Sequence, residues 1–364
     1  MMSCASTTAP FACALDAWIA KECAARSPEE LLSRLTTAQW RALARTLRHA
    51  AKHSTFYAHA LCGHDLAPHR SEDLAQLPFT LPQDLSAWET LLCTSLGDVQ
   101  RLVTMPTSGT TGMPKRLAFT QRDLERIGLF FAAGMSYLVK PGSSVAVLLP
   151  GAQRPNGVAD LLRQALVSLD IPVACPPPDL LHKEQTSALA AWLRKTAPST
   201  VVAMPTQLQR LFSAIPQGLP CLSGVLSSAE PLDVSLGTAL RSQWNCELLD
   251  HYGLTEAGYG CALECPSHDG YHLRAMDIFV EIVSPDDGHL LPVNAVGEIV
   301  ITTLDREAMP LIRYRTGDMS SLLSEPCTCG SPLPRLGPIL GRIVRDASGQ
   351  TRILRLPKRE AAPC

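Results

Sequence analysis

The chain has 364 residues and a formal net charge of −2, and 46% of its residues are hydrophobic. This composition supports a large buried core, and the length suggests about two domains. The sequence contains no clustered basic run, which a nucleic-acid partner would require for phosphate neutralisation. Its apolar stretches are too short to cross a bilayer, and no basic residue precedes the apolar N-terminal segment as in a signal peptide. We therefore expect a cytoplasmic protein with no nucleic-acid or membrane partner.

Helices are predicted over residues 28–60, where leucines recur at helical spacing. From residue 120 onward, amphipathic helices alternate with short apolar strands. Thr120 is predicted to cap the first of these helices, with Asp123 at its third position. The predicted strands cover residues 145–149, 171–174, 201–204, 224–226 and 246–249. Because apolar strands separated by helices are typical of parallel sheets, this pattern predicts an α/β fold whose mainly parallel sheet is flanked by helices.

The pattern changes after residue 275. Apolar runs at 278–283 and 296–303 flank a turn at 286–288, which predicts an antiparallel hairpin. We therefore expect an α/β body with a helical N-terminal segment (1–275), a small β subdomain (276–341) and a short tail (342–364).

The sharpest motif is TSGTTGMPK at residues 107–115. Its glycines allow close approach of the backbone to an anion, its hydroxyl groups can donate to phosphate oxygens, and its lysine supplies a positive charge. The glycine spacing differs from that of the P-loop, and the alternative is a surface turn rich in Ser, Thr and Gly. The candidate phosphate-binding residues are Thr107, Ser108, Gly109, Thr110, Thr111, Gly112 and Lys115.

A second motif, HYGLTE at residues 251–256, directly follows the predicted strand 246–249. Ligands of open α/β sheets bind at the carboxyl ends of parallel strands. Tyr252 could stack on a base, Thr255 could bond a phosphate and Glu256 could hold Mg²⁺, whereas the alternative is an ordinary strand-to-helix turn. Two further segments, SAEP at 228–231 and RYRTGD at 313–318, follow the preceding strand and the β subdomain.

These motifs, in this order, resemble those of the acyl-adenylate-forming superfamily, and within it the phenylacetate–CoA ligase-like branch. The branch is indicated by LPFT at 77–80 with the following Asp84-Leu85, by SAEP, and by MPLIRYR at 309–315. The resemblance extends from about residue 30 to about residue 342. It implies the fold of the large N-terminal domain of an adenylate-forming enzyme.

The resemblance also implies roles for single residues. Residues 107–115 would wrap the triphosphate, and Thr255 and Glu256 would reach the α-phosphate and Mg²⁺. The remaining implied roles are an adenine pocket of Ala229, Glu230 and Pro231 with Tyr252 against the base, a ribose contact from Asp318, and a junction to a mobile C-terminal lid at Arg342.

The implied reaction is the ATP-dependent activation of a small carboxylic acid, with AMP and pyrophosphate as products and coenzyme A as co-substrate. Relatives carry a lid domain with a lysine that assists adenylation, and we expect this chain to lack it. Three alternatives follow: a working acid–thiol ligase, an adenylate-forming protein that acts with a carrier protein or a separate lid-supplying protein, and a non-catalytic nucleotide-binding protein.

The sequence holds thirteen cysteines, and three of them form a candidate metal site with a histidine. Cys327 and Cys329 are separated by a single residue, and a glycine follows them. Cys265 precedes the Gly-Tyr-His element that ends at His272. Three thiolates and an imidazole can form a closed tetrahedral zinc site. His268 is the alternative imidazole, and buried free thiols are the alternative to a metal. The resemblance favours structural zinc and His272, because some members of the branch hold zinc at equivalent places.

Overall fold

The computed structural model describes residues 11–105, 114–151, 154–345 and 351–355. The N-terminal region is helical and contains α1 (Ala14–Cys23), α2 (Pro28–His53), α3 (Thr55–Ala60), α4 (Ser71–Leu74) and α5 (Trp88–Leu91). The helices predicted over 28–60 are therefore confirmed. They are separate at Ser54, because its side chain accepts a hydrogen bond from the Tyr57 amide and caps α3.

The main sheet has nine strands in the order β13-β14-β9-β8-β7-β6-β5-β3-β4. One half is parallel and consists of β3 (Val145–Val147), β4 (Val173–Ala174), β5 (Thr200–Ala203), β6 (Gly224–Ser227) and β7 (Glu247–Tyr252). The other half is antiparallel and consists of β8 (Ala262–Glu264), β9 (Tyr271–Leu273), β13 (Leu322–Leu323) and β14 (Arg335–Leu336). The sheet is thus more mixed than predicted. The link from β7 to β8 is too short for the crossover that a parallel pair needs.

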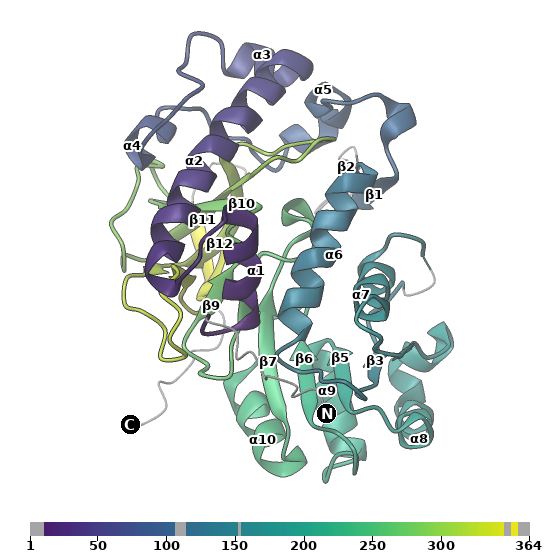
Figure 1. Ribbon diagram of the computed structural model, residues 1–364. Helices are drawn as coiled ribbons and strands as arrows, with labels where there is room; N and C mark the ends of the chain where they lie inside the picture. Colours follow the sequence, from purple (N-terminus) through teal and green to yellow (C-terminus); the bar gives the residue numbers. More distant parts are fainter. Residues whose placement is uncertain (1–10, 106–113, 152–153, 346–350, 356–364) are drawn as a thin grey trace, which may run out of the picture.

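Helices cover both faces of the parallel half (Figure 1). One face packs α6 (Gln121–Met135) and α7 (Val158–Val167) against Val145, Val147 and Leu226. The opposite face packs α8 (Thr186–Thr196), α9 (Pro205–Ala214) and α10 (Val234–Trp244) against Ala146, Leu148 and Val225. The alternation along each strand explains why these strands appear in the sequence as unbroken apolar runs. The predicted cap of α6 is also present, as a capping box between Thr120 and Asp123.

The second sheet has five antiparallel strands in the order β10-β11-β12-β15-β16. They are β10 (Ile278–Val283), β11 (Gly297–Thr303), β12 (Tyr314–Ser320), β15 (Gly341–Arg345) and β16 (Thr351–Arg355). The predicted hairpin is present as β10 and β11. Helix α2 lies against this sheet, with the Trp40 and Phe279 rings 5.1 Å apart between centroids (Figure 1). A separate ribbon, β1 (Arg101–Met105) and β2 (Lys115–Phe119), completes the strands of the described residues.

Both sheets extend across the domain boundaries that were expected from the sequence. Strands β13 and β14 come from the stretch assigned to the β subdomain, yet they extend the nine-stranded sheet. Strands β15 and β16 come largely from the stretch assigned to the tail, yet they extend the five-stranded sheet. Residues 314–318 of the segment 313–318 form most of the central strand β12. No helix of the described ranges is long and apolar enough to cross a membrane.

The buried guanidinium of Arg313 joins the N-terminal region to the second sheet. The guanidinium of Arg313 lies 3.0 Å from the carboxylate of Glu281, and both side chains are buried. The same guanidinium donates to the carbonyls of Ala75 and Leu77 and lies over the Phe79 ring. Two of the segments that indicate the branch, LPFT and MPLIRYR, therefore meet here, in a structural contact.

Candidate functional site

A pocket of about 370 Å³ opens at the carboxyl ends of β6 and β7. Four parts of the chain that are distant in sequence surround it: the segment after β6, the end of β7, β9, and the strands β12 and β15 with the residues before β15. Its lining residues are Ala229, Glu230, Pro231, Leu232, Asp233, Asp250, His251, Tyr252, Gly253, Tyr271, Asp318, Ile339, Gly341 and Arg342. Five residues with implied nucleotide contacts, the 229–231 segment with Tyr252 and Asp318, are thus brought together, and Arg342 lies beside them.

The segment after β6 is shaped by its own hydrogen bonds. Ala229 has a φ of 72°, which turns the chain sharply after the strand. The Glu230 carboxylate accepts from the Thr206 amide at 3.1 Å, so this side chain is held at the start of α9. Asp233 caps α10 by accepting from the amides of the next turn. These contacts anchor both ends of the segment that lines the pocket.

Tyr252 and Asp318 are joined across the pocket wall. The Tyr252 hydroxyl donates to Asp318 at 2.9 Å, and the Arg342 guanidinium lies 3.8 Å from the other carboxylate oxygen. Burial raises the pKa of Asp318, while Arg342 and the Tyr252 hydrogen bond lower it. Arg342, expected at the junction to a lid, lies in β15 and is paired in register with Asp318. Tyr252 was expected after a strand, but it is the last residue of β7.

Three predicted catalytic residues lie outside the lining of this pocket. Thr255 and Glu256 lie in a short 3-10 turn that follows β7. The Glu256 carboxylate accepts from the Tyr314 hydroxyl at 2.8 Å, and its main-chain carbonyl accepts from Arg306 at 2.7 Å. Lys115 begins β2 and is partly buried. The predicted phosphate-binding residues 107–112 lie outside the described residues.

Four polar residues of the pocket lining were not predicted from the sequence: Asp233, Asp250, His251 and Tyr271. The Tyr271 hydroxyl donates to Asp250 at 2.7 Å, which joins β9 to β7. His251 shares the end of β7 with Tyr252, and its Nδ1 lies 3.2 Å from the Ser228 hydroxyl. Burial lowers the pKa of His251 to about 4, so its ring is neutral at pH 7. Only the position of His251 inside the HYGLTE motif could have indicated it.

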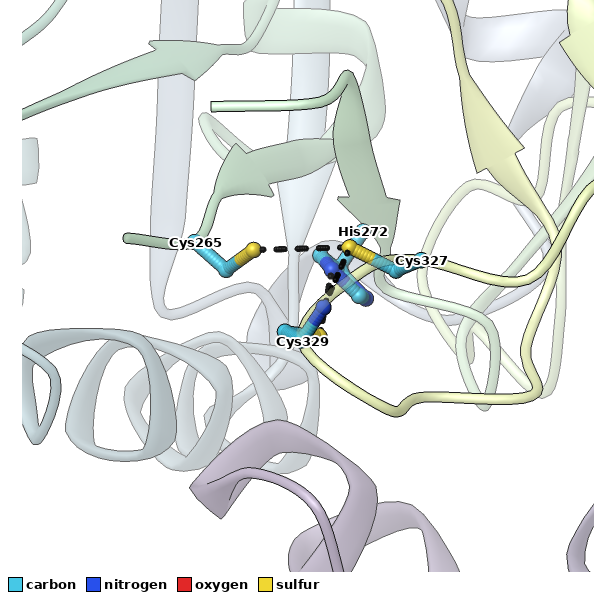
Figure 2. A group of neighbouring side chains, drawn as sticks. All are labelled: Cys265, His272, Cys327 and Cys329. Carbon is cyan, nitrogen blue, oxygen red and sulfur yellow. Dashed lines mark hydrogen bonds between the residues drawn. The ribbon is translucent and has the colours of Figure 1, made fainter. Parts of the chain in front are cut away.

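The predicted metal cluster also assembles. One ligand atom from each of Cys265, His272, Cys327 and Cys329 lies within 4.8 Å of the others. Figure 2 shows the four side chains pointing toward one another, with 3.6 Å between the sulfurs of Cys265 and Cys327 and 3.6 Å between Cys329 Sγ and His272 Nε2. His268 instead pairs with Glu247 at 3.1 Å, outside the cluster.

Local structure explains why the donors converge. Cys265 directly follows β8, and His272 lies in the neighbouring strand β9. Cys327 and Cys329 share a tight turn that Gly330 closes with a φ of 93°. Burial lowers the pKa of His272 to about 4 and raises the pKa of the Cys265 thiol. A neutral imidazole with three sulfurs is a donor set that fits zinc, whose charge would offset the cost of burying thiolates.

Comparisons with known proteins identify the family of this chain. Residues 98–304 match the model of the AMP-binding enzyme family. The chain belongs to this family. It is 31% identical over 287 residues to the phenylacetate-coenzyme A ligase of Thermus thermophilus and 30% identical over 283 residues to that of Pseudomonas putida. In both alignments, 74% of this chain is matched to 61% of the relative's length.

The fold agrees with a solved structure as well. An open conformation of 2-hydroxyisobutyryl-CoA ligase superposes with a TM-score of 0.73 at 19% identity, covering 89% of this chain and 73% of that one. The resemblance to phenylacetate–CoA ligases and the expected adenylate-forming fold are therefore confirmed.

Proposed function

We propose that the chain carries the nucleotide-handling part of an ATP-dependent acid–thiol ligase that works through an acyl adenylate. The observation that carries this proposal is the single pocket in which the segment 229–231, Tyr252 and Asp318 meet from three elements. Family membership and the two phenylacetate-coenzyme A ligase relatives support it further. Coenzyme A is the proposed acceptor, and a carrier-protein thiol would use the same second step.

The pocket would hold the adenosine part of ATP. The backbone of Ala229, Glu230 and Pro231 would line the adenine, and the Tyr252 ring would pack against it. Asp318 would accept hydrogen bonds from the ribose hydroxyls. Because Tyr252 donates to one oxygen of this carboxylate, the group is oriented before the nucleotide binds.

In the first step, a carboxylate oxygen of the acid attacks the α-phosphorus. The new phosphorus–oxygen bond forms as the bond to the β-phosphate breaks, and pyrophosphate leaves with its electron pair. Lys115, Thr255 and residues 107–112 would contact the phosphates, so that the chain contributes mainly positioning and charge neutralisation. In the second step, the thiol gives up its proton and its sulfur attacks the acyl carbon, the bond from that carbon to the phosphate oxygen breaks, and AMP leaves with the electron pair.

Glu256 is the proposed Mg²⁺ ligand. Tyr314 fixes one of its carboxylate oxygens, and no described residue bonds the other, which fits a cation that takes one or two protein carboxylates. Bound Mg²⁺ would screen the phosphate charge during the attack.

The cluster of Cys265, His272, Cys327 and Cys329 would hold one structural Zn²⁺. The bound ion would fasten the β8–β9 hairpin to the turn before β14, behind the pocket wall that Tyr271 provides. The described cysteines form no disulfide, which supports a reducing compartment such as the cytoplasm.

The proposal is tested by ATP–pyrophosphate exchange with a panel of carboxylic acids. Exchange that requires an acid supports an adenylating enzyme. Tight ATP binding with no exchange for any acid would favour a non-catalytic nucleotide-binding protein.

A further inference from the structure

A second, smaller cavity of about 40 Å³ adjoins the nucleotide pocket. Helices α6 and α7 and the ends of the parallel strands form its walls, with Phe130, Met135 and Leu162 among the apolar side chains. Its only polar side chains among the described residues are those of Ser228 and His251, and no described charged side chain lines it. An apolar enclosure beside a nucleotide pocket is suited to the hydrocarbon part of a substrate.

His251 belongs to both cavities and connects them. Its Nδ1 faces the Ser228 hydroxyl, whereas its Nε2 is buried and has no hydrogen-bond partner among the described residues. A side chain in place of Gly260 would put its Cβ 2.5 Å from the Phe130 ring and 3.2 Å from this Nε2 atom. Glycine at position 260 thus lets the Phe130 ring and the imidazole pack closely against the main chain at a wall of the apolar cavity.

An unpartnered buried polar atom is costly, because it loses its hydrogen bonds to water. When the Ser228 hydroxyl donates to Nδ1, the neutral ring carries its proton on Nε2 and offers one donor. A carboxylate oxygen is an acceptor that matches this donor. His251 lines both the apolar cavity and the nucleotide pocket, so such a carboxylate would lie close to the nucleotide.

We propose that this cavity binds a short aliphatic monocarboxylic acid and that His251 Nε2 donates a hydrogen bond to its carboxylate. The inference rests on the proposed adenylating function, in which an acid carboxylate must reach the nucleotide. A cavity needs about 10–15 Å³ of this volume for each water-sized group, so the site accommodates about three such groups. A six-carbon aromatic ring requires the walls to move. A second carboxylate finds no charged partner there, and an unpaired buried charge is strongly disfavoured.

Two neighbouring leucines of α7 provide a matched pair of variants. Leu162 lines the cavity, whereas Leu166 lies one turn later, is fully buried in the same core and does not line it. Both Leu162→Ala and Leu166→Ala remove the same atoms from the same helix, but only the first enlarges the cavity.

Binding of sodium butyrate and sodium phenylacetate is measured by ligand-observed NMR for the wild type and both variants, with acid-dependent pyrophosphate exchange alongside. We expect the wild type to prefer butyrate by about tenfold or more, since one methylene in an apolar pocket changes binding by about 10–200-fold. Leu162→Ala should shift the ratio toward phenylacetate by about tenfold, and Leu166→Ala should keep the wild-type ratio. A wild type that binds phenylacetate at least as tightly as butyrate, or an equal shift in both variants, overturns the inference.

His251→Ala should weaken butyrate about tenfold or more, because it removes a hydrogen bond to a charged group. His251→Gln, whose amide can still donate, should recover part of that loss. Unchanged butyrate binding in His251→Ala contradicts the role of this residue. Selective butyrate binding without exchange for any acid would refute the proposed adenylation and leave the cavity inference standing.

Discussion

Replacing Tyr252 with phenylalanine tests how the pocket holds the ribose. The change removes only the hydroxyl that donates to Asp318 at 2.9 Å and keeps the ring proposed to pack on adenine. A hydrogen bond to a charged group contributes about 1.5–3 kcal/mol. Without the hydroxyl, Asp318 still lies on β12 opposite Arg342 and keeps this partner. We therefore expect the lower end of the range, which is a loss of about tenfold in nucleotide affinity.

Titration calorimetry with ATP and AMP measures this loss. Both nucleotides carry the ribose, so both dissociation constants should rise by the same factor. Tyr271→Phe is the matched control, since it also removes a tyrosine–aspartate hydrogen bond at the wall of this pocket. It should change nucleotide affinity much less, because Asp250 has no proposed ribose contact.

The same variant predicts a pH dependence. Burial already raises the pKa of Asp318, and the Tyr252 hydrogen bond lowers it. Removing that bond moves the pKa further up, so the carboxylate becomes protonated at a higher pH. As the pH falls, Tyr252→Phe should therefore lose ATP affinity before the wild type does. Equal affinities for wild type and Tyr252→Phe at every pH would refute the proposed ribose contact.

Three other predictions concern separate parts of the molecule. Lys115→Ala should weaken ATP more than AMP in the same titrations, because its charge would address the outer phosphates, and an equal loss for both contradicts that role. Elemental analysis should find one zinc per chain, lost in Cys327→Ser and kept in the exposed-cysteine control Cys62→Ser, and zinc-free wild type purified without chelator rules the site out. Glu281→Ala should lower the free energy of unfolding in urea by about 3–5 kcal/mol, since it leaves a buried guanidinium unpaired. The exposed-pair control Asp305→Ala should cost about 1 kcal/mol or less, and equal costs would show that burial is irrelevant here.

The sequence predicts the parallel half of the main sheet well and the antiparallel half poorly. Residues 224–226 and 201–204 form unbroken apolar runs because both faces of their strands are buried under helices. Strands β13 and β14 have two residues each, which is too few for any periodicity. Strand β14 forms by pairing with β9, which is distant in sequence, and the local sequence does not indicate this partner.

The cluster of Cys265, His272, Cys327 and Cys329 was predictable in its cysteines and ambiguous in its histidine. Thiols spaced as at Cys327 and Cys329 are distinctive in sequence, whereas two histidines four residues apart are equally plausible ligands. The fold decides between them, because His272 lies in β9 beside the thiols and His268 pairs with Glu247. The role proposed for His251 could not be predicted, since it depends on two cavities that form only when distant strands and helices pack together.

The central claim, that an acid carboxylate attacks the α-phosphorus of ATP, is tested most directly by an oxygen-isotope experiment. The purified chain is incubated with ATP, coenzyme A and an acid whose carboxylate oxygens are ¹⁸O, and the products are analysed by mass spectrometry. The account predicts AMP that carries a single labelled oxygen, because the attacking oxygen stays on phosphorus when the thiol displaces AMP. Label in inorganic phosphate, with ADP as the nucleotide product, would contradict it.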